Sequence, residues 1–287
     1  MPRIIFMTIA LLATAFAAPA LAEPPAGYYG SVNRNSPADL RRTLHELIDD
    51  HTIYPLESDD GVDIWDILQL ADENVDNASN VITIFRNASY PKQDGPDFNV
   101  GIDYGWPKQY GFPVYEEGNI PYTDGHNMFI ADGEYASSRN GWLAAGCTTT
   151  CNEKPTETNN GRGGGSGTFP GNSNWTLTQA NNGLWQVWNG RKGDIARAVF
   201  YTEIRYEGGV HMPSGFPEPQ FNFPGGFRPD ALIDRTRSGE NESEGFYGNL
   251  SALLAWQAED PPDAIEQQHH ETVAAFQGNR NPFIDHP

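Results

Sequence analysis

The sequence predicts a single α+β domain. Five runs have the apolar spacing and end signals of helices, namely residues 36–51, 63–73, 193–205, 250–256 and 263–276. Two runs rich in β-branched and aromatic residues predict strands, at 81–85 and 184–188. Because no repeat and no clear linker divides the chain, we interpret the long polar stretches as loop inserts in one domain.

Composition sets limits on structure and on partners. The chain has 287 residues, of which 38% are hydrophobic and 12% aromatic, and this is enough for a real core. Its 38 acidic and 18 basic residues give a formal charge of −20. Such a charge argues against a general electrostatic attraction for nucleic acid. It is equally consistent with acidity that keeps an exported protein soluble, which requires no partner.

Residues 1–22 have the pattern of a secretory signal peptide. Arg3 precedes an apolar run from Ile4 to Ala18, and Ala20-Leu21-Ala22 forms an A-x-A cleavage site. No other apolar stretch approaches the length of a membrane span. We therefore expect a secreted or periplasmic protein with no membrane segment, a mature domain over residues 23–287, and a monomer.

The two cysteines are close in sequence. Cys147 and Cys151 are separated by three threonines, and in an oxidising compartment such neighbours most simply pair with each other. Two free thiols are the alternative, because so short a ring restricts the geometry. A zinc site is disfavoured, since no second Cys or His pair accompanies them at ligand spacing.

The first predicted helix has a well-defined start. Ser36 is suited to the N-cap, Pro37 to the first helical position, and Asp39 to the positive end of the helix dipole. A later stretch, residues 147–182, is rich in Gly, Asn and Thr, and we expect a flexible surface insert there. Its glycine run, 161–167, lacks the Lys-Ser/Thr pair of a phosphate-binding loop.

Two groups of polar residues on predicted helices have more than one interpretation. Arg197, Tyr201 and Arg205 recur every four residues and so share one helix face. They are either a surface pattern paired with nearby acids or a phosphate clamp, to which the guanidinium fork is suited. His269 and His270 lie among Glu and Gln residues, and we expect them to be solvated.

The clearest candidate for chemistry is the segment from residue 99 to residue 129. It contains a carboxylate, Asp103, and an amide, Asn127, and both are hard oxygen ligands for a divalent cation. They lie on segments close enough to form one hairpin-and-helix unit. His126, a titratable imidazole, is adjacent to the second ligand.

Most of the mature chain resembles the bacterial secreted and periplasmic endonuclease I family. The matching segments, in order, include Trp106-Pro107-Lys108, Pro121-Tyr122-Thr123-Asp124, His126-Asn127, Ser137-Ser138-Arg139-Asn140, Gly193-Asp194-Ile195-Ala196-Arg197-Ala198 and Gln277-Gly278-Asn279-Arg280-Asn281-Pro282-Phe283. Members of this family are metal-dependent nucleases of the ββα-metal (His-Me finger) class. They cut DNA, and often RNA, with little sequence preference.

The resemblance implies roles for particular residues. The family has Arg-Glu-His ahead of Trp-Pro, where Glu binds the metal and His activates water, whereas this chain has Ile102-Asp103-Tyr104. Asp103 and Asn127 are then the ligands of Mg²⁺, or of Ca²⁺ or Mn²⁺. Arg197 matches the arginine of the helix motif, and we expect it and Arg139 to contact the substrate phosphate.

Tyr104 is the departure that matters, because a phenol is about a thousandfold less ionised at neutral pH than a poised base, and loss of a general base costs ~10²–10⁴ in rate. Three outcomes stay open: activity with Tyr104 ionised by the cation or with His126 as substitute base, slow activity that relies on metal-bound water, or an inactive relative that binds nucleic acid or cations. A hydrolase that acts on another substrate through paired acids such as Glu116 and Glu117 has no spacing evidence.

Overall fold

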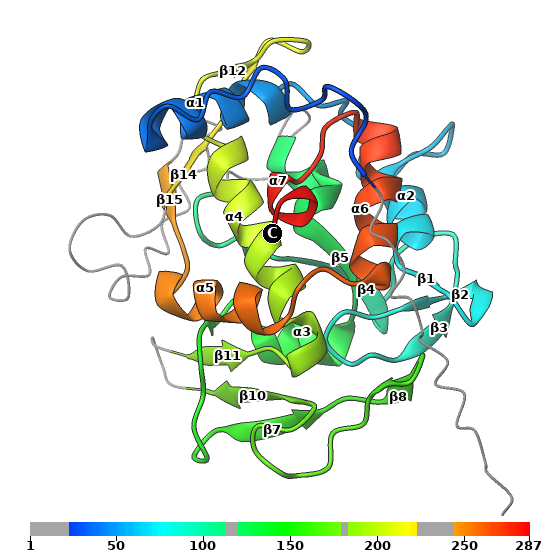
Figure 1. The fold of residues 1–287 in the computed structure, drawn as a ribbon. Helices are drawn as coiled ribbons and strands as arrows, with labels where there is room; N and C mark the ends of the chain where they lie inside the picture. The colour runs from blue at the N-terminus through cyan, green and yellow to red at the C-terminus, as the bar shows by residue number, and fades with distance from the viewer. Residues whose placement is uncertain (1–22, 113–119, 179–182, 223–243) are drawn as a thin grey trace, which may run out of the picture.

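In the computed structural model, helix α4 (Lys192–Arg205) runs through the middle of the molecule, and each of its 14 residues is buried (Figure 1). The structure describes residues 23–112, 120–178, 183–222 and 244–287. The predicted signal peptide and the acids at 116 and 117 lie outside these residues. No helix in the described ranges is both long and apolar enough to span a membrane.

The other helices surround α4. They are α1 (Pro37–Ile48), α2 (Ile64–Ala71), α3 (Gly133–Arg139), α5 (Leu250–Glu259), α6 (Ala264–Gln277) and α7 (Pro282–Asp285). Figure 1 shows α1 above α4, α5 below it, and α6 beside it with α2 behind. The helices α1, α5 and α7 all contact α4, while α6 packs against α2.

The strands form small sheets rather than one large one. One sheet contains β1 (Glu73–Asn74), β2 (Asn77–Ile82) and β3 (Ser89–Pro91), and a second contains β4 (Val100–Tyr104) and β5 (Met128–Asp132). A third sheet has four strands, in the spatial order β6 (Leu143–Ala144), β11 (Leu184–Gln186), β10 (Ser173–Leu177) and β7 (Asn152–Pro155). The remaining pairs are β8 (Thr158–Asn159) with β9 (Arg162–Gly163), β12 (Val210–His211) with β13 (Phe216–Pro217), and β14 (Gln220–Asn222) with β15 (Glu244–Phe246). This mixture of helices and sheets confirms the α+β prediction.

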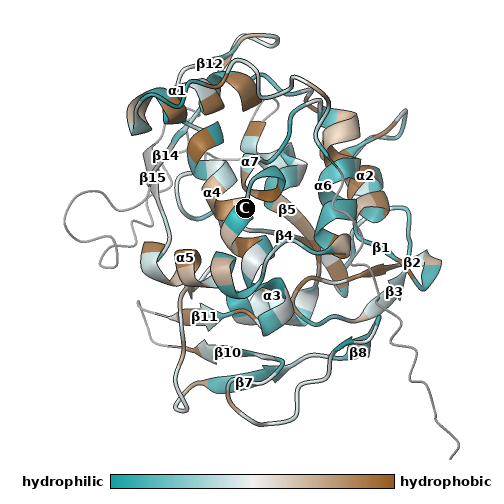
Figure 2. Cartoon of the chain, viewed as in Figure 1, coloured by the Kyte–Doolittle hydropathy of each residue, from teal (hydrophilic) through white to brown (hydrophobic). Residues whose placement is uncertain are grey.

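The core surrounds the hairpin of β4 and β5. All five residues of β5 are buried, and most of this strand is drawn brown in Figure 2. The pairing is antiparallel, with Ile102 opposite Ile130 and Asp103 opposite Phe129. Helix α3 follows β5 directly, because Asp132 caps it by accepting hydrogen bonds from the backbone N–H groups of Glu134 and Tyr135.

The helix predictions are confirmed, and both strand predictions are wrong in their bounds. The strand expected at 184–188 ends at Gln186. Helix α1 has Ser36 as N-cap, and the Ser36 hydroxyl accepts a hydrogen bond from the backbone of Asp39. The strand expected at 81–85 starts earlier and ends at Ile82, because Thr83 enters a turn that closes on Ala88. Asn87 in that turn has a φ of 56°, a conformation that Asn tolerates better than most residues.

The described part of the stretch from 147 to 182, residues 147–178, is more ordered than we expected. It contains β7, β8, β9 and β10, and β10 lies inside the four-stranded sheet. Asn174 on β10 is fully buried. Its amide donates to Phe85 O at 2.7 Å, and its Oδ1 accepts from the Trp188 backbone at 3.1 Å. The composition of this stretch predicts a loop, yet the Asn174 side chain satisfies two main-chain groups inside the core.

His269 and His270 are buried, so the expectation that they are solvated is wrong. His269 lies on α6 with Nδ1 at 2.7 Å from Asp72 Oδ1 and Nε2 at 3.0 Å from Gly125 O. Both partners are acceptors, so both ring nitrogens carry protons and the imidazole is charged. Burial alone would lower the pKa of His269, but the Asp72 carboxylate raises it above its ordinary value.

The His269 contact predicts a pH-dependent stability. A raised folded pKa means that the contribution is complete below the unfolded pKa and is lost as pH rises through the folded pKa. We expect His269→Gln to lower the unfolding free energy by about 2 kcal/mol at pH 6, the scale of a charge-assisted hydrogen bond. The difference from wild type should shrink towards pH 9, as measured by denaturant unfolding.

His211→Gln is the matched control for this experiment. His211 is also buried, but its ring nitrogens face a hydroxyl, Ser214 Oγ, and a carbonyl, His51 O. Its loss should not follow the pH profile of the His269 variant. An equal loss for His269→Gln at every pH would show that His269 is not charged in the folded protein.

Candidate functional site

The two predicted metal ligands lie near the same end of the β4–β5 hairpin. Asp103 is the second-last residue of β4, and Asn127 directly precedes β5. The Gly105 backbone donates to Asn127 O at 2.8 Å, and the Trp106 backbone donates to Asn127 Oδ1 at 2.7 Å. The hairpin therefore fixes the amide beside the chain that leaves Asp103.

Gly105 allows this close approach. A Cβ atom at this position would lie 2.7 Å from Ala198 Cβ on α4 and 3.1 Å from Asn127 Oδ1. The first of these distances is too short for any real side chain. The absence of a side chain at Gly105 thus lets α4 pack against the end of the hairpin near which both candidate ligands lie.

Asp103 is held by an arginine. Its Oδ1 accepts hydrogen bonds from the Tyr104 backbone and from Arg139 Nη1, both at 2.8 Å. Among the described residues no hydrogen bond is made by its Oδ2, and the side chain is 17% exposed. One carboxylate oxygen is therefore in use, and the other has coordination capacity left.

Arg139 is buried at the end of α3 and contacts the protein rather than an open surface. Besides Asp103, it donates to Tyr104 O at 2.6 Å and to Gly105 O at 2.9 Å. Burial opposes its charge, but the Asp103 carboxylate raises the pKa of the guanidinium above its ordinary value. In this arrangement Arg139 positions residues 103–105.

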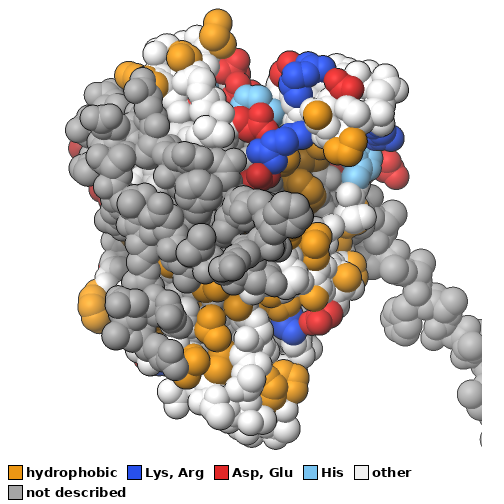
Figure 3. Space-filling model, turned by 90° about the vertical axis from the view of Figure 1, so that its left-hand side faces the viewer, with side chains coloured by type: hydrophobic (Ala, Val, Ile, Leu, Met, Phe, Trp, Pro, Cys, Tyr) orange, Lys and Arg blue, Asp and Glu red, His pale blue; other side chains and the backbone are white. Residues whose placement is uncertain are grey.

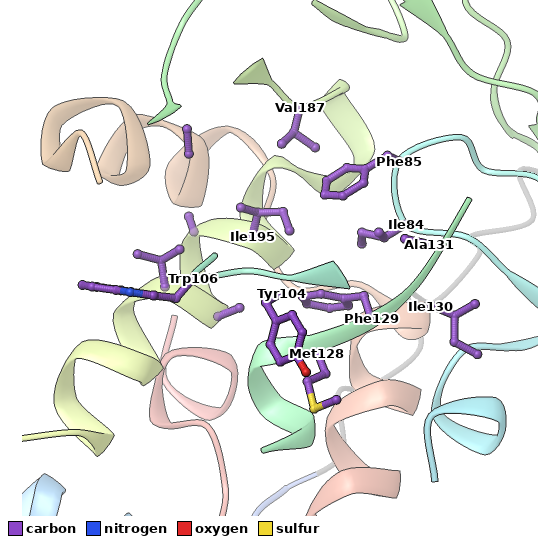
Figure 4. Close-up of a cluster of buried hydrophobic side chains, with 14 of the residues drawn as sticks. Ile84, Phe85, Tyr104, Trp106, Met128, Phe129, Ile130, Ala131, Val187 and Ile195 are labelled. Carbon is purple, nitrogen blue, oxygen red and sulfur yellow. The ribbon is translucent and has the colours of Figure 1, made fainter. Parts of the chain in front are cut away.

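Tyr104 lies in an aromatic cluster. Its side chain is 2% exposed, and its hydroxyl donates to Tyr122 O at 3.0 Å. Figure 4 shows the ring among buried hydrophobic side chains, with its hydroxyl close to Met128. The Lys108 ammonium lies 5.0 Å from the ring centroid. In this arrangement the phenol donates its proton to the main chain.

His126 is also buried. Its Nε2 lies 3.1 Å from Asn279 O and therefore carries the proton, while Nδ1 has no hydrogen-bond partner among the residues that the structure describes. Burial, together with the neighbouring His270, lowers the pKa of His126 to about 3. The His126 imidazole is therefore neutral, and it contacts the C-terminal segment through Asn279.

The sequence did not reveal the role of Asp124, which supports the loop that carries Asn127. This carboxylate is fully buried. Its Oδ2 accepts from the hydroxyls of Tyr201 and Tyr206, both at 2.9 Å, and its Oδ1 accepts from the His126 backbone at 3.1 Å. The available signal was its position as N-cap of the short helix at Gly125–Asn127.

The arginines of α4 face inward. Arg197 donates from Nε and Nη2 to the Glu266 carboxylate at 2.7 and 2.6 Å. Arg205 binds Glu218 and Asp49. These partners lie on other segments of the chain. The helix face that Arg197 and Arg205 share is therefore not a surface pattern, and in this arrangement it is not an open clamp for phosphate.

The remaining candidate groups have clear positions. Cys147 and Cys151 form a disulfide, which confirms the pairing interpretation. Within the described residues, one cluster of three potential His, Asp or Glu metal ligands occurs, at His270, Glu271 and Asp285. The Arg280 guanidinium already binds both carboxylates of this cluster, so a cation there would be repelled.

Comparison with known proteins agrees with the motifs. A family model described as Endonuclease I matches residues 38–287. The chain is 30% identical over 264 residues to a protein named extracellular ribonuclease from Bacillus subtilis (strain 168), covering 91% of this chain and 75% of the relative. The protein of the same name from Bacillus amyloliquefaciens is 30% identical over 263 residues, with 91% and 75% coverage. The chain belongs to the endonuclease I family.

Proposed function

We propose that this protein is a secreted nuclease that hydrolyses phosphodiester bonds with the help of a divalent cation. The observation that carries this proposal is the position of Asp103 and Asn127 near the same end of the β4–β5 hairpin in a chain of this family. The relatives named extracellular ribonuclease support RNA as a substrate, with DNA beside it. In this proposal the consecutive β4, β5 and α3 correspond to the two strands and the helix of a ββα-metal core.

The donor set suits a hard cation. Asp103 offers Oδ2, and Asn127 offers the second lone pair of Oδ1. Mg²⁺ is commonly held by one or two carboxylates together with waters and substrate phosphates, and Ca²⁺ and Mn²⁺ also take oxygen ligands. A bound cation would stabilise the charge that develops on the phosphate and the leaving oxygen.

The chain's own residues define the rest of the site. Arg139 keeps the Asp103 carboxylate in a fixed direction, and the Trp106 backbone does the same for the Asn127 amide. Direct contact of Arg139 or Arg197 with a phosphate stays a prediction, and in this structure both side chains are buried against Asp103 and Glu266.

The lack of an imidazole at position 104, where this chain has Tyr104, limits the rate in this proposal. To accept a proton from water, the Tyr104 hydroxyl would have to leave Tyr122 O and ionise in a buried aromatic cluster. Ionisation there is opposed by loss of solvation. We therefore propose slow hydrolysis, without general-base help from Tyr104.

The second candidate function is an inactive relative that binds nucleic acid or cations. The burial of the Tyr104 hydroxyl against Tyr122 O is the observation that favours it. Both candidates retain Asp103 and Asn127, so they differ in turnover and not in binding.

The secreted location rests on three observations. Residues 1–22 predict a signal peptide, the disulfide suits an oxidising compartment, and the relatives carry the name extracellular. Detection of the mature chain in the culture medium would test it.

Asn127→Ala should abolish degradation of plasmid DNA and of RNA in the presence of Mg²⁺, because it removes a metal ligand. Asn174→Ala is the matched control, since Asn174 is an equally buried Asn that bonds main-chain groups on β10. Each variant leaves main-chain groups unpaired and should lose about 1–3 kcal/mol of stability. Activity per folded molecule should fall only for Asn127→Ala, and EDTA should stop the wild type.

Degradation that survives both EDTA and Asn127→Ala would contradict the metal mechanism. Absence of degradation by the wild type with Mg²⁺, Mn²⁺ and Ca²⁺ alike would favour the inactive relative.

Tyr104→His should raise the rate of cleavage, by ~10²–10⁴ if the imidazole reaches the position of a general base. Tyr104→Phe removes the hydroxyl alone and should leave the slow rate nearly unchanged. Single-turnover cleavage of a labelled oligonucleotide across pH 6–9 measures both. Loss of activity in Tyr104→Phe would show instead that the phenol takes part in proton transfer.

A further inference from the structure

A pocket of about 440 Å³ opens at the other end of the β4–β5 hairpin. It lies where β4 begins and α3 starts, and its walls come from three parts of the chain: Arg86 and Tyr90, Phe98 and Asn99, and Asp132, Gly133, Glu134 and Ser137. This volume falls within the ~300–1,000 Å³ of pockets that hold small molecules. Neither the proposed metal ligands nor Tyr104 line it.

Phe98 is the unusual member of this pocket. Its side chain is 93% exposed, the largest exposure among the large hydrophobic residues described. Its main chain is nevertheless held close to Gly133. The neighbouring Asn99 O accepts a 2.8 Å hydrogen bond from Gly133 N. The packing is so close that a Cβ at Gly133 would lie 2.2 Å from Phe98 O. The fold holds an aromatic ring in water beside a pocket, at a cost in exposed apolar surface.

The polar groups of the pocket suit a flat, neutral ligand with donors and acceptors. Arg86 forms ion pairs through Nη1 with Asp132 and through Nε with Glu157, and Nη2 takes part in neither ion pair. The amide of Asn99 and the hydroxyl of Ser137 complete the set. An aromatic platform, a guanidinium plane and short polar side chains are the groups with which proteins bind unpaired nucleobases.

Charge selects a base over a phosphate here. Asp132 and Glu134 line the pocket with Arg86, and Lys154 pairs with Glu134, so the site carries no excess of positive charge. The whole chain has a formal charge of −20. On the face shown in Figure 3, the basic side chains coloured by type lie beside acidic ones. A protein of this charge gains more from a neutral base than from added phosphate contacts.

The hairpin connects the pocket with the proposed cleavage site. Asn99 and Asp103 are four residues apart, or about 13 Å at the rise of a strand. Gly101, between them on the same side of β4, is open there, since a Cβ at this position would meet only Asp97 O within 4 Å, at 3.8 Å. A nucleic-acid strand bound at Asp103 can reach the pocket within about four nucleotides, at the rise of ~3.4 Å per stacked nucleotide.

We infer that this pocket binds an unpaired nucleobase of the substrate a few nucleotides from the scissile bond, with the base stacked on Phe98. The pocket takes this role only if nucleic acid is the substrate, as proposed above. It gives the protein a preference for single strands over duplexes, in which the bases are not free to enter.

Binding without cleavage tests the pocket directly. A fluorescently labelled single-stranded octanucleotide is titrated with the full mature protein in EDTA, and anisotropy gives the Kd. Phe98→Ala should weaken binding about fivefold or more, the lower end of the effect of a lost base–aromatic stack. Ser137→Trp, which fills the pocket from the exposed face of α3, should weaken it similarly. The same octamer in a duplex should bind wild type and Phe98→Ala alike.

Met212→Ala is the matched control, because Met212 is also a strongly exposed apolar residue, on the β12–β13 hairpin. It should bind as wild type does, and thermal unfolding should show all three variants folded. If Phe98→Ala and Ser137→Trp both bind the single strand as wild type does, or if wild type does not bind it, the pocket has no such role.

A parallel cleavage assay with Mg²⁺ reports on the proposed function separately. Binding that depends on Phe98 without cleavage would retain the base pocket and overturn the nuclease proposal. Cleavage by the wild type with no effect of Phe98→Ala on binding would retain the nuclease and overturn the base pocket.

Discussion

The buried guanidinium of Arg139 is the constraint on which the candidate site depends. It binds Asp103 Oδ1 and the carbonyl oxygens of Tyr104 and Gly105, so one side chain fixes three consecutive residues at the end of β4. Removing one partner of a buried ion pair typically costs ~3–5 kcal/mol. The direction of the Asp103 carboxylate, the burial of Tyr104 and the turn at Gly105 all follow from this contact and from the packing of α4.

The same use of arginine inside the molecule limits how an acidic protein of this family can bind nucleic acid. Arg139, Arg197 and Arg205 are buried against carboxylates, and these bonds hold α3, α4 and the segments that pack on them. Cations used in this way are not available on the surface for phosphate. The proposed recognition of nucleic acid therefore relies on a bound metal ion and on neutral contacts such as the proposed stack on Phe98.

Sequence reasoning succeeded where short-range signals decide the structure. The start of α1 at Ser36-Pro37 was predictable, because the capping contact between Ser36 and Asp39 is local. The disulfide between Cys147 and Cys151 was predictable for the same reason.

Contacts between distant segments were not predictable. His269 appeared solvated because its neighbours in sequence are polar, yet Asp72, 197 positions away, makes it a buried cation. Arg197 appeared to be either a surface or a phosphate residue, and its partner Glu266 lies 69 positions away. Helical spacing shows which residues share a face but not what that face packs against. Asn174 was missed because composition alone suggested a loop.

The proposed cation site at Asp103 and Asn127 is tested most directly by titration of the purified protein with Mn²⁺, followed by electron paramagnetic resonance of the free ion. The wild type and Asn174→Ala should bind Mn²⁺ with the same affinity, and Asn127→Ala should lose this binding while it stays folded. Equal Mn²⁺ binding by the wild type and by folded Asn127→Ala would contradict the assignment of this hairpin end as the metal site.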